Sequence, residues 1–265
     1  MSKVKDIVKY FEDRVPPEMK MEGDNVGLLV GLRETVVTKA VVALDITPEV
    51  IEEAASFGAQ IILSHHPLFF DLSRINDDCF NGCRITKLIQ NGISAFCQHT
   101  NLDQVNGGVN TTLAIALGIE IEGFLSDSFT AKNGESYGMG RFGNLKAPTD
   151  MVSFLPFVKS VLKTDGLRFY DAGRPVKRVG VVGGTGGKYV ERALQEGCDT
   201  VVTADIKHSE FLLAKHLGMN LIDGGHYCTE NLVVPILVSM LTEGFPEIEV
   251  RIAESAGAPA CFYMG

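Results

Sequence analysis

The chain has 265 residues, of which 45% are hydrophobic, and its formal net charge at pH 7 is −9. This length allows one large domain or two ordinary ones, and the apolar fraction is ample for a core. The acidic balance argues against a surface built to bind nucleic acid, because such a surface draws on clustered lysine and arginine. No apolar run reaches the ~20 residues of a membrane span, so we expect a cytoplasmic protein that does not interact with membranes.

The first predicted element is an amphipathic helix near the N-terminus. Val4, Ile7, Val8 and Phe11 recur at helical spacing, and charged residues lie between them. A signal peptide would need an uninterrupted apolar stretch in this place. The pattern therefore indicates a surface helix that packs against a folded domain.

Two stretches of the chain then follow the same order of elements. Residues 39–66 align with residues 178–205 without a gap. In each stretch a β-rich run leads through a turn to a helix-patterned segment, which ends at Gly58 or Gly197 before a second strand. A third strand follows Gly92 in the first copy and Gly218 in the second. This order predicts an α/β fold of two similar units related by duplication, each with parallel strands, packed as a three-layer architecture.

Domain boundaries are predicted from the segment between the copies. Residues 124–175 carry repeated glycine and proline, which is typical of loops and short strands. We expect a discontinuous first domain of residues 1–125, to which the C-terminal segment 226–265 returns. Residues 126–225 would form the second domain.

Two adjacent histidines mark the end of a predicted strand. His65 and His66 follow the apolar run of residues 59–64, and Pro67 cannot continue a strand ladder. In open α/β sheets such carboxyl ends are where sites form. Side chains of neighbouring strand residues point to opposite faces. Both imidazoles can therefore face one site only if the backbone turns there, or if two metal ions lie on different sides.

Further imidazoles and carboxylates lie at other predicted strand ends. His99 and Asp103 follow the strand near residues 93–97, and His226 and Glu230 are four apart, so they would share a face of a helix that begins near His226. Mixed imidazole and carboxylate ligands suit zinc, iron, manganese or nickel better than calcium or magnesium. Two carboxylates can bridge, which favours two ions about 3.5–4 Å apart. The alternative is that these polar residues only cap strands and helices.

Other polar positions have simpler interpretations. Residues 183–187 form a glycine-rich run between a strand and a helix, but their spacing misses both nucleotide-binding fingerprints, so a tight turn is favoured over a phosphate site at the backbone amides. Asp45 heads the equivalent turn of the first copy and could point into a cleft. Asp205 is the counterpart of His66, and capping and solvation are favoured for it over a role in substrate binding.

Three segments resemble the metal-binding motifs of the NIF-three-like family, whose members are commonly labelled GTP cyclohydrolase 1 type 2 homologues. They are residues 64–70 (SHHPLFF), 99–103 (HTNLD) and 225–230 (GHYCTE). Further matches at residues 23–31, 106–110 and 138–143 follow in the same order, so the resemblance covers nearly the whole chain. One departure is Gly23, which stands where the family often has an aromatic residue.

This resemblance implies a dinuclear metal centre with two divalent ions in the cleft between the two α/β units. The implied ligands are His65, His66, Asp103, His226 and Glu230, with Asp103 and Glu230 as the bridges. His99 would be an outer partner or a proton carrier, the kind of group that metal sites recruit. Relatives are also ring-shaped homohexamers, so the resemblance implies a homo-oligomer.

Three functions are compatible with such a centre. The first is a metal-dependent hydrolase, in which a metal-bridging water attacks a small-molecule substrate that carries a phosphate or a nucleotide. The second is the opening of the GTP ring that the family label implies, although nothing in the sequence singles out guanine. The third is a non-catalytic regulatory or interaction module that binds metal, because a fold and a site do not name a reaction.

Overall fold

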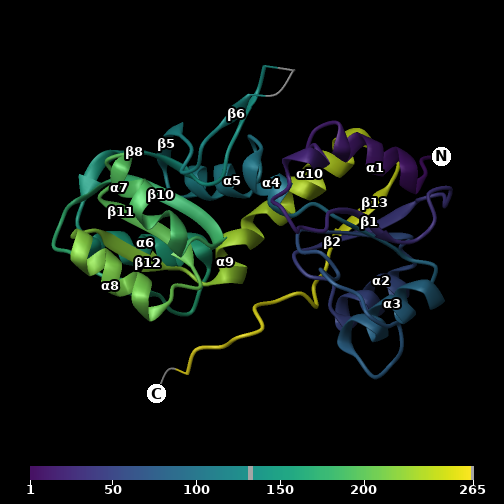
Figure 1. Ribbon diagram of the computed structural model, residues 1–265. Helices are drawn as coiled ribbons and strands as arrows, with labels where there is room; N and C mark the ends of the chain where they lie inside the picture. Colours follow the sequence, from purple (N-terminus) through teal and green to yellow (C-terminus); the bar gives the residue numbers. More distant parts are fainter. Residues whose placement is uncertain (131–133, 264–265) are drawn as a thin grey trace. The chain divides into compact units, whose positions relative to one another are not determined.

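The computed structural model describes residues 1–130 and 134–263. The chain folds into two units, each with its own sheet (Figure 1). Unit 1 comprises residues 1–102 and 234–257, and unit 2 comprises residues 103–233 and the C-terminal segment from residue 258. Helices flank both sheets, which makes this the layered α/β fold expected from the sequence. The domain boundaries expected near residues 125 and 225 stay a prediction.

Unit 1 is built on a five-stranded sheet with the order β1-β4-β3-β2-β13. Its strands are β1 (Gly27–Val30), β2 (Lys39–Ala43), β3 (Ile61–Ser64), β4 (Ser94–Cys97) and β13 (Glu249–Ile252). The neighbours from β13 to β4 pair in parallel, and β1 is antiparallel to β4. The C-terminal part of the chain thus contributes an edge strand to the sheet of unit 1.

Helices cover both faces of this sheet (Figure 1). They are α1 (Val4–Glu12), α2 (Pro48–Phe57), α3 (Phe80–Gln90) and α10 (Val234–Gly244), with a 3-10 turn at Pro17–Met19. The buried side of α2 packs with Val41 and Ile62 on one face, whereas Phe11 of α1 contacts Phe96 on the other, with ring centroids 5.8 Å apart. The predicted N-terminal helix is confirmed, because α1 buries Val4, Ile7, Val8 and Phe11.

Unit 2 is built on a six-stranded sheet with the order β5-β8-β10-β11-β12-β9. Its strands are β5 (Ile119–Gly123), β8 (Arg141–Thr149), β9 (Arg168–Tyr170), β10 (Val176–Thr185), β11 (Thr200–Ala204) and β12 (Asn220–Asp223). The central pairs β10-β11 and β11-β12 are parallel, and the outer pairs are antiparallel. A separate hairpin joins β6 (Phe129–Thr130) and β7 (Ser136–Tyr137).

Alternate residues of the central strands in unit 2 face two different helical layers. Val202 and Ile222 pack with α5 (Val109–Ala116) and α6 (Met151–Leu162). Val201 and Leu221 pack on the opposite side with α7 (Val190–Gln195) and α8 (His208–Leu217). Short helical segments complete the unit, namely Gly187–Tyr189, α9 (His226–Glu230) and Asn231–Val233. This sheet between two helical layers has the expected three-layer form.

One expectation for residues 124–175 is wrong. Besides loops and short strands, this segment contains the 12-residue helix α6 and the nine-residue strand β8. Asp150 caps α6 by accepting a hydrogen bond from the Ser153 amide at 2.7 Å, and Phe154 and Val158 are buried on one face. Pro156 lies inside the helix, where its ring nitrogen cannot donate a backbone hydrogen bond. Burial of the apolar face offsets the hydrogen bond that this proline cannot make.

The predicted duplication extends to the register of the strands. Ala40 is the partner of Ile61 in the β2-β3 pair, and the aligned residue Val179 is the partner of Thr200 in the β10-β11 pair. Gly58 and Gly197 both end their helices with left-handed backbones, at φ of 77° and 78°. The gapless alignment therefore describes equivalent backbone positions. In the part of the chain that the structure describes, no helix is long and apolar enough to span a membrane.

Candidate metal centre

Three histidines gather in unit 1, and we call them the histidine cluster. His65 and His66 follow β3, and His99 follows β4. Each ring offers a ligand nitrogen, and these nitrogens lie within 4.8 Å of one another. The backbone bends at His65 and His66, which is one of the two arrangements that the sequence left open. The Ser64 hydroxyl donates to the His66 carbonyl at 2.8 Å, and the His66 amide donates to Leu44 O at 2.9 Å.

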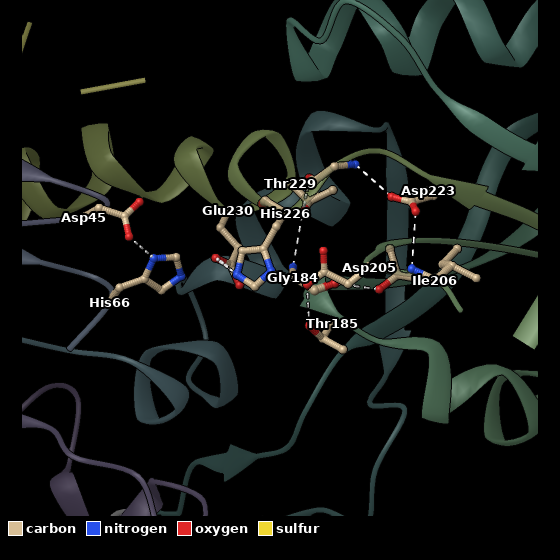
Figure 2. A network of polar contacts seen from close by, with 12 residues as sticks. Asp45, His66, Gly184, Thr185, Asp205, Ile206, Asp223, His226, Thr229 and Glu230 are labelled. Atoms are coloured by element: carbon tan, nitrogen blue, oxygen red, sulfur yellow. Dashed lines mark hydrogen bonds and ion pairs between the residues drawn. The ribbon is translucent and has the colours of Figure 1, made fainter. Parts of the chain in front are cut away.

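Each imidazole of the histidine cluster has an acceptor at Nδ1. The acceptors are Gln98 O for His65, Asp45 Oδ1 for His66 and Asp24 Oδ1 for His99, at 2.9, 2.7 and 2.8 Å. A carbonyl or an ionised carboxylate can only accept, so the neutral ring carries its proton on Nδ1 and its lone pair on Nε2. Figure 2 shows the contact between His66 and Asp45. This arrangement fixes the tautomer in the way that metal-binding histidines require.

Asp24 contacts a candidate site residue, His99, and it was not singled out from the sequence. Besides His99, its carboxylate accepts hydrogen bonds from the amide and the hydroxyl of Thr100. Burial works against the charged form, but these hydrogen bonds outweigh it and hold the pKa of Asp24 well below its usual range. The only signal in the sequence was its position inside the matched segment 23–31.

Three further candidate ligands belong to unit 2, and we call them the carboxylate cluster. They are Asp103, His226 and Glu230. Helix α9 begins at His226, which confirms the expected shared face, and His226 Nε2 lies 3.1 Å from Glu230 Oε2. Carboxylate oxygens of Asp103 and Glu230 lie within 4.8 Å of one another. The unit thus brings together an imidazole and the two carboxylates that were expected to bridge.

His226 also has a carboxylate at Nδ1. Asp205 Oδ2 lies 2.6 Å from this nitrogen and accepts a second hydrogen bond from the Thr185 hydroxyl at 2.6 Å (Figure 2). The hydrogen bond to Glu230 raises the pKa of His226 to about 9, with a further contribution from Asp205 and against the effect of burial. Asp205 therefore orients His226, a role that was not expected from the sequence. Its left-handed backbone, at φ 52°, is one that aspartate tolerates.

The backbone of the glycine-rich run at the end of β10 contacts the side chains around it. Gly183 N donates to Asn110 Oδ1 at 2.9 Å, and Gly184 N donates to Thr229 Oγ1 at 3.0 Å. A Cβ atom added to Gly187 would lie 2.1 Å from the Glu210 carboxylate. Side chains of the protein, one of them anionic, occupy these positions, so the structure favours a strand-to-helix turn over a phosphate site.

Both clusters consist of ligand types that suit a divalent transition metal. Imidazole nitrogen and carboxylate oxygen bind zinc, iron, manganese or nickel without a thiolate. All four histidines have an acceptor at Nδ1, which directs Nε2 to be the ligand atom. The residues therefore form groups that could hold metal ions.

Comparisons with known proteins agree with this fold. Residues 2–259 match the family model described as Duf34/NIF3 (NGG1p interacting factor 3). A Clostridium perfringens protein named GTP cyclohydrolase 1 type 2 homolog is 36% identical over 240 residues, which cover 90% of this chain and 89% of the relative. A Lactococcus lactis protein with the same name is 32% identical over 269 residues and covers 98% of this chain and 99% of the relative.

Solved structures give the same result. The Staphylococcus aureus hypothetical protein SA1388 has a TM-score of 0.90 at 30% sequence identity, covering 98% of this chain and 99% of that chain. A Bacillus cereus protein related to NIF3 has a TM-score of 0.91 at 25% identity, covering 99% of both chains. The class is thus a layered α/β protein with histidine and carboxylate groups suited to metal. The chain belongs to the Duf34/NIF3 family, as its motifs indicated.

Proposed function

We propose that His65, His66, Asp103, His226 and Glu230 together hold two divalent metal ions and that the protein is a metal-dependent hydrolase. The observation that supports this most directly is the common arrangement of the histidines, each of which has its hydrogen-bond acceptor at Nδ1, so that Nε2 is the nitrogen directed to the ligand role. Structural capping alone would not require the same ring nitrogen to be engaged in every case. Zinc, iron, manganese and nickel fit this ligand set.

The two carboxylates of unit 2 are the proposed bridges between the ions. Asp103 and Glu230 offer oxygens within 4.8 Å of one another, and a bridging pair must converge in this way on ions about 3.5–4 Å apart. Glu230 Oε2 also lies 3.1 Å from His226 Nε2, and the raised pKa of His226 keeps a proton there. His226 and Glu230 would give up that proton when they bind a divalent cation.

When bound, the ions would supply Lewis acidity and water activated at neutral pH. The chain's own residues orient the ligands and move protons. Asp24 holds the Nδ1 proton of His99, so His99 Nε2 is the atom that would accept a proton from a group beside His65 and His66 and return it. We therefore assign His99 as a proton carrier and Asp24 as the residue that orients it.

The proposed substrate is a small molecule that carries a phosphate or a nucleotide. The support is the printed name of the relatives, GTP cyclohydrolase 1 type 2 homolog, which makes GTP the first compound to test. The acidic composition argues against nucleic acid as a partner. From the family resemblance we also propose a cytoplasmic homohexamer, which a mass measurement in solution would test.

Metal analysis of the purified protein is the first experiment. We expect about two ions per chain, and we expect the double variant Asp103→Ala, Glu230→Ala to lose them while it still unfolds cooperatively. Full metal retention in that variant would refute the site. The metal-loaded protein is then screened with phosphate esters, nucleotides and cyclic amides, and formate release from GTP would identify ring opening.

A second candidate function is a metal-binding interaction module. The family description names an interacting factor, which is the observation in its favour. In this case the metal-loaded protein would turn over none of the screened compounds, although metal binding would be intact. Turnover that disappears with His99→Gln but leaves the metal content unchanged would instead support the hydrolase.

A further inference from the structure

Asn110 is a buried side chain that the proposed chemistry does not use. It lies in the first turn of α5 and has no exposed surface. Its Nδ2 donates to the carbonyl oxygen of Asp103 at 2.9 Å, and its Oδ1 accepts from the amide of Gly183 at 2.9 Å. One carboxamide therefore joins the segment that carries Asp103 to the glycine-rich run at the end of β10.

The same glycine-rich run supports the other proposed bridging carboxylate. A Cβ atom on Gly184 would lie 2.2 Å from Glu230 Oε1, and one on Gly183 would lie 3.3 Å from Glu230 Cγ. Gly184 N also donates to Thr229 Oγ1, one residue before Glu230. The side chain of Glu230 thus rests on the backbone of residues 183–184. Asn110 is the connection between this backbone and Asp103.

Arg141 holds the Asp103 segment from another direction and is itself buried. Its five N–H donors all meet acceptors, which are Thr111 Oγ1 and the carbonyl oxygens of Gln104, Val105, Gly138 and Gly140, at distances of 2.7–3.2 Å. Burial lowers the pKa of Arg141 to about 10, so the guanidinium stays charged at neutral pH and attracts Asp103. The backbone just after Asp103 cannot shift without breaking these bonds.

We propose that Asn110 is a positioning residue of the metal centre, which fixes the backbone of Asp103 relative to the loop that supports Glu230. It thereby sets the separation of the two carboxylates that would bridge the ions. This inference rests on the proposed function. It goes beyond that function because Asn110 is not one of the proposed ligands and acts through the backbone of Asp103 and Gly183.

The chemistry of the position explains why asparagine is needed there. Asp103 O requires a donor and Gly183 N requires an acceptor, and a carboxamide supplies both from one short side chain. Aspartate would keep the acceptor and lose the donor. Glutamine would add a methylene to a close-packed site, which forces its neighbours to move.

The test compares Asn110→Ala with Asn220→Ala in the full chain. Asn220 is a matched control, because it is equally buried in unit 2 and its carboxamide also bridges backbone groups, at Ala172 N and Arg174 O. The readouts are the dissociation constant for zinc, measured by chelator competition, and the visible absorption spectrum of the protein loaded with cobalt(II). Thermal unfolding of the metal-free variants measures the structural cost of each change.

For Asn110→Ala we expect zinc affinity to fall by about 10–100-fold, which is typical for the loss of a group that orients ligands. The cobalt(II) spectrum should change as well. Asn220→Ala should lower the unfolding temperature similarly and keep the wild-type affinity and spectrum. Asn110→Asp preserves the side-chain volume and should repeat the loss of affinity if the alanine variant does not fold.

Two results would overturn the inference. One is wild-type affinity and spectrum in whichever Asn110 variant folds. The other is an equal loss of affinity in the Asn110 and Asn220 variants, which would mean that both act only through stability. Failure of the proposed function looks different, because the unmodified protein would then bind no zinc at all.

Discussion

The two copies of the duplicated unit have matching strand positions but different polar side chains. Gln60 in unit 1 accepts hydrogen bonds from the amides of Thr38 and Lys39, at 2.8 and 3.0 Å. Asp199, the aligned residue in unit 2, accepts from the amides of Lys177 and Arg178, at 3.1 and 2.8 Å. The side chains that hold the strands together thus remain at equivalent positions even where their identity differs.

The candidate site differs at the aligned positions that follow these strands. In unit 1 the carboxylate is Asp45, after the first strand, and it pairs with His66 after the second. In unit 2 the residue aligned with Asp45 is Gly184, and the carboxylate is Asp205, aligned with His66. Glycine at 184 leaves the space that Glu230 fills. The duplication therefore supplies equivalent strand ends, and each copy places its histidine and carboxylate differently on them.

The largest expected effect comes from adding a side chain at Gly184, the position aligned with Asp45. In Gly184→Ala, a Cβ would meet Glu230 Oε1 at 2.2 Å and His226 Cε1 at 3.2 Å, on a backbone with φ +62°. We expect a loss of about 3 kcal/mol of stability, from left-handed strain and displaced side chains, together with loss of bound metal. Gly58→Ala is the control, because φ is +77° but no atom lies within 4 Å, so only a stability loss should appear. Chemical denaturation and metal analysis measure both, and retained metal in Gly184→Ala would contradict the expectation.

A smaller effect is expected from the carboxylates that orient histidines. Asp45→Asn and Asp205→Asn keep the size of each side chain and weaken the acceptor at Nδ1 of His66 or His226. Each change should reduce metal affinity by about 10–100-fold. Similar losses of metal affinity in the two variants would show that the two carboxylates orient their histidines to the same extent, although they lie at different aligned positions. Affinity that is unchanged in both variants would mean that these carboxylates are surface groups without influence on the ligands.

The strand-holding side chains should affect stability and leave metal binding unchanged. Asp199→Ala removes a charged acceptor and should cost about 2 kcal/mol, whereas Gln60→Ala removes a neutral one and should cost about 1 kcal/mol. Urea unfolding of the two variants gives the difference. A larger cost for Gln60→Ala than for Asp199→Ala would contradict the expectation that the charged acceptor contributes more.

The smallest expected effect is a change in acid sensitivity at Asp24. Its pKa is lowered in the folded protein, so the stability it contributes is present above the ordinary carboxyl pKa and is lost as the pH falls through and below that range. Asp24→Asn should flatten the loss of stability below about pH 4. Unfolding measured between neutral and acidic pH tests this, and an unaltered pH profile in the variant would remove Asp24 as a contributor.

The parts of the site that were predicted lie close to clear sequence signals. His65 and His66 stand between an apolar strand and a proline, and His226 and Glu230 have helical spacing after two glycines. The acceptors at Nδ1 had no such signal, because Asp24 is 75 residues from His99 and Asp205 is 21 from His226. Contacts of this kind depend on how strands are ordered in a sheet. Helix α6 was missed for a different reason, because the repeated glycine and proline of residues 124–175 indicated loops, whereas burial of one face stabilises the helix despite Pro156.

Helices α4 (Thr100–Gln104) and α9 carry Asp103, His226 and Glu230, and each has only five residues. Isolated helices shorter than about 12–15 residues are marginal in water, so these segments depend on their surroundings for their shape. An ion that binds only the folded chain adds stability that grows with the logarithm of its free concentration, about 2.7 kcal/mol at one hundred times the dissociation constant. For the proposed metal centre, the unfolding temperature of this protein should therefore rise with the free concentration of the metal, and removing the metal should lower it.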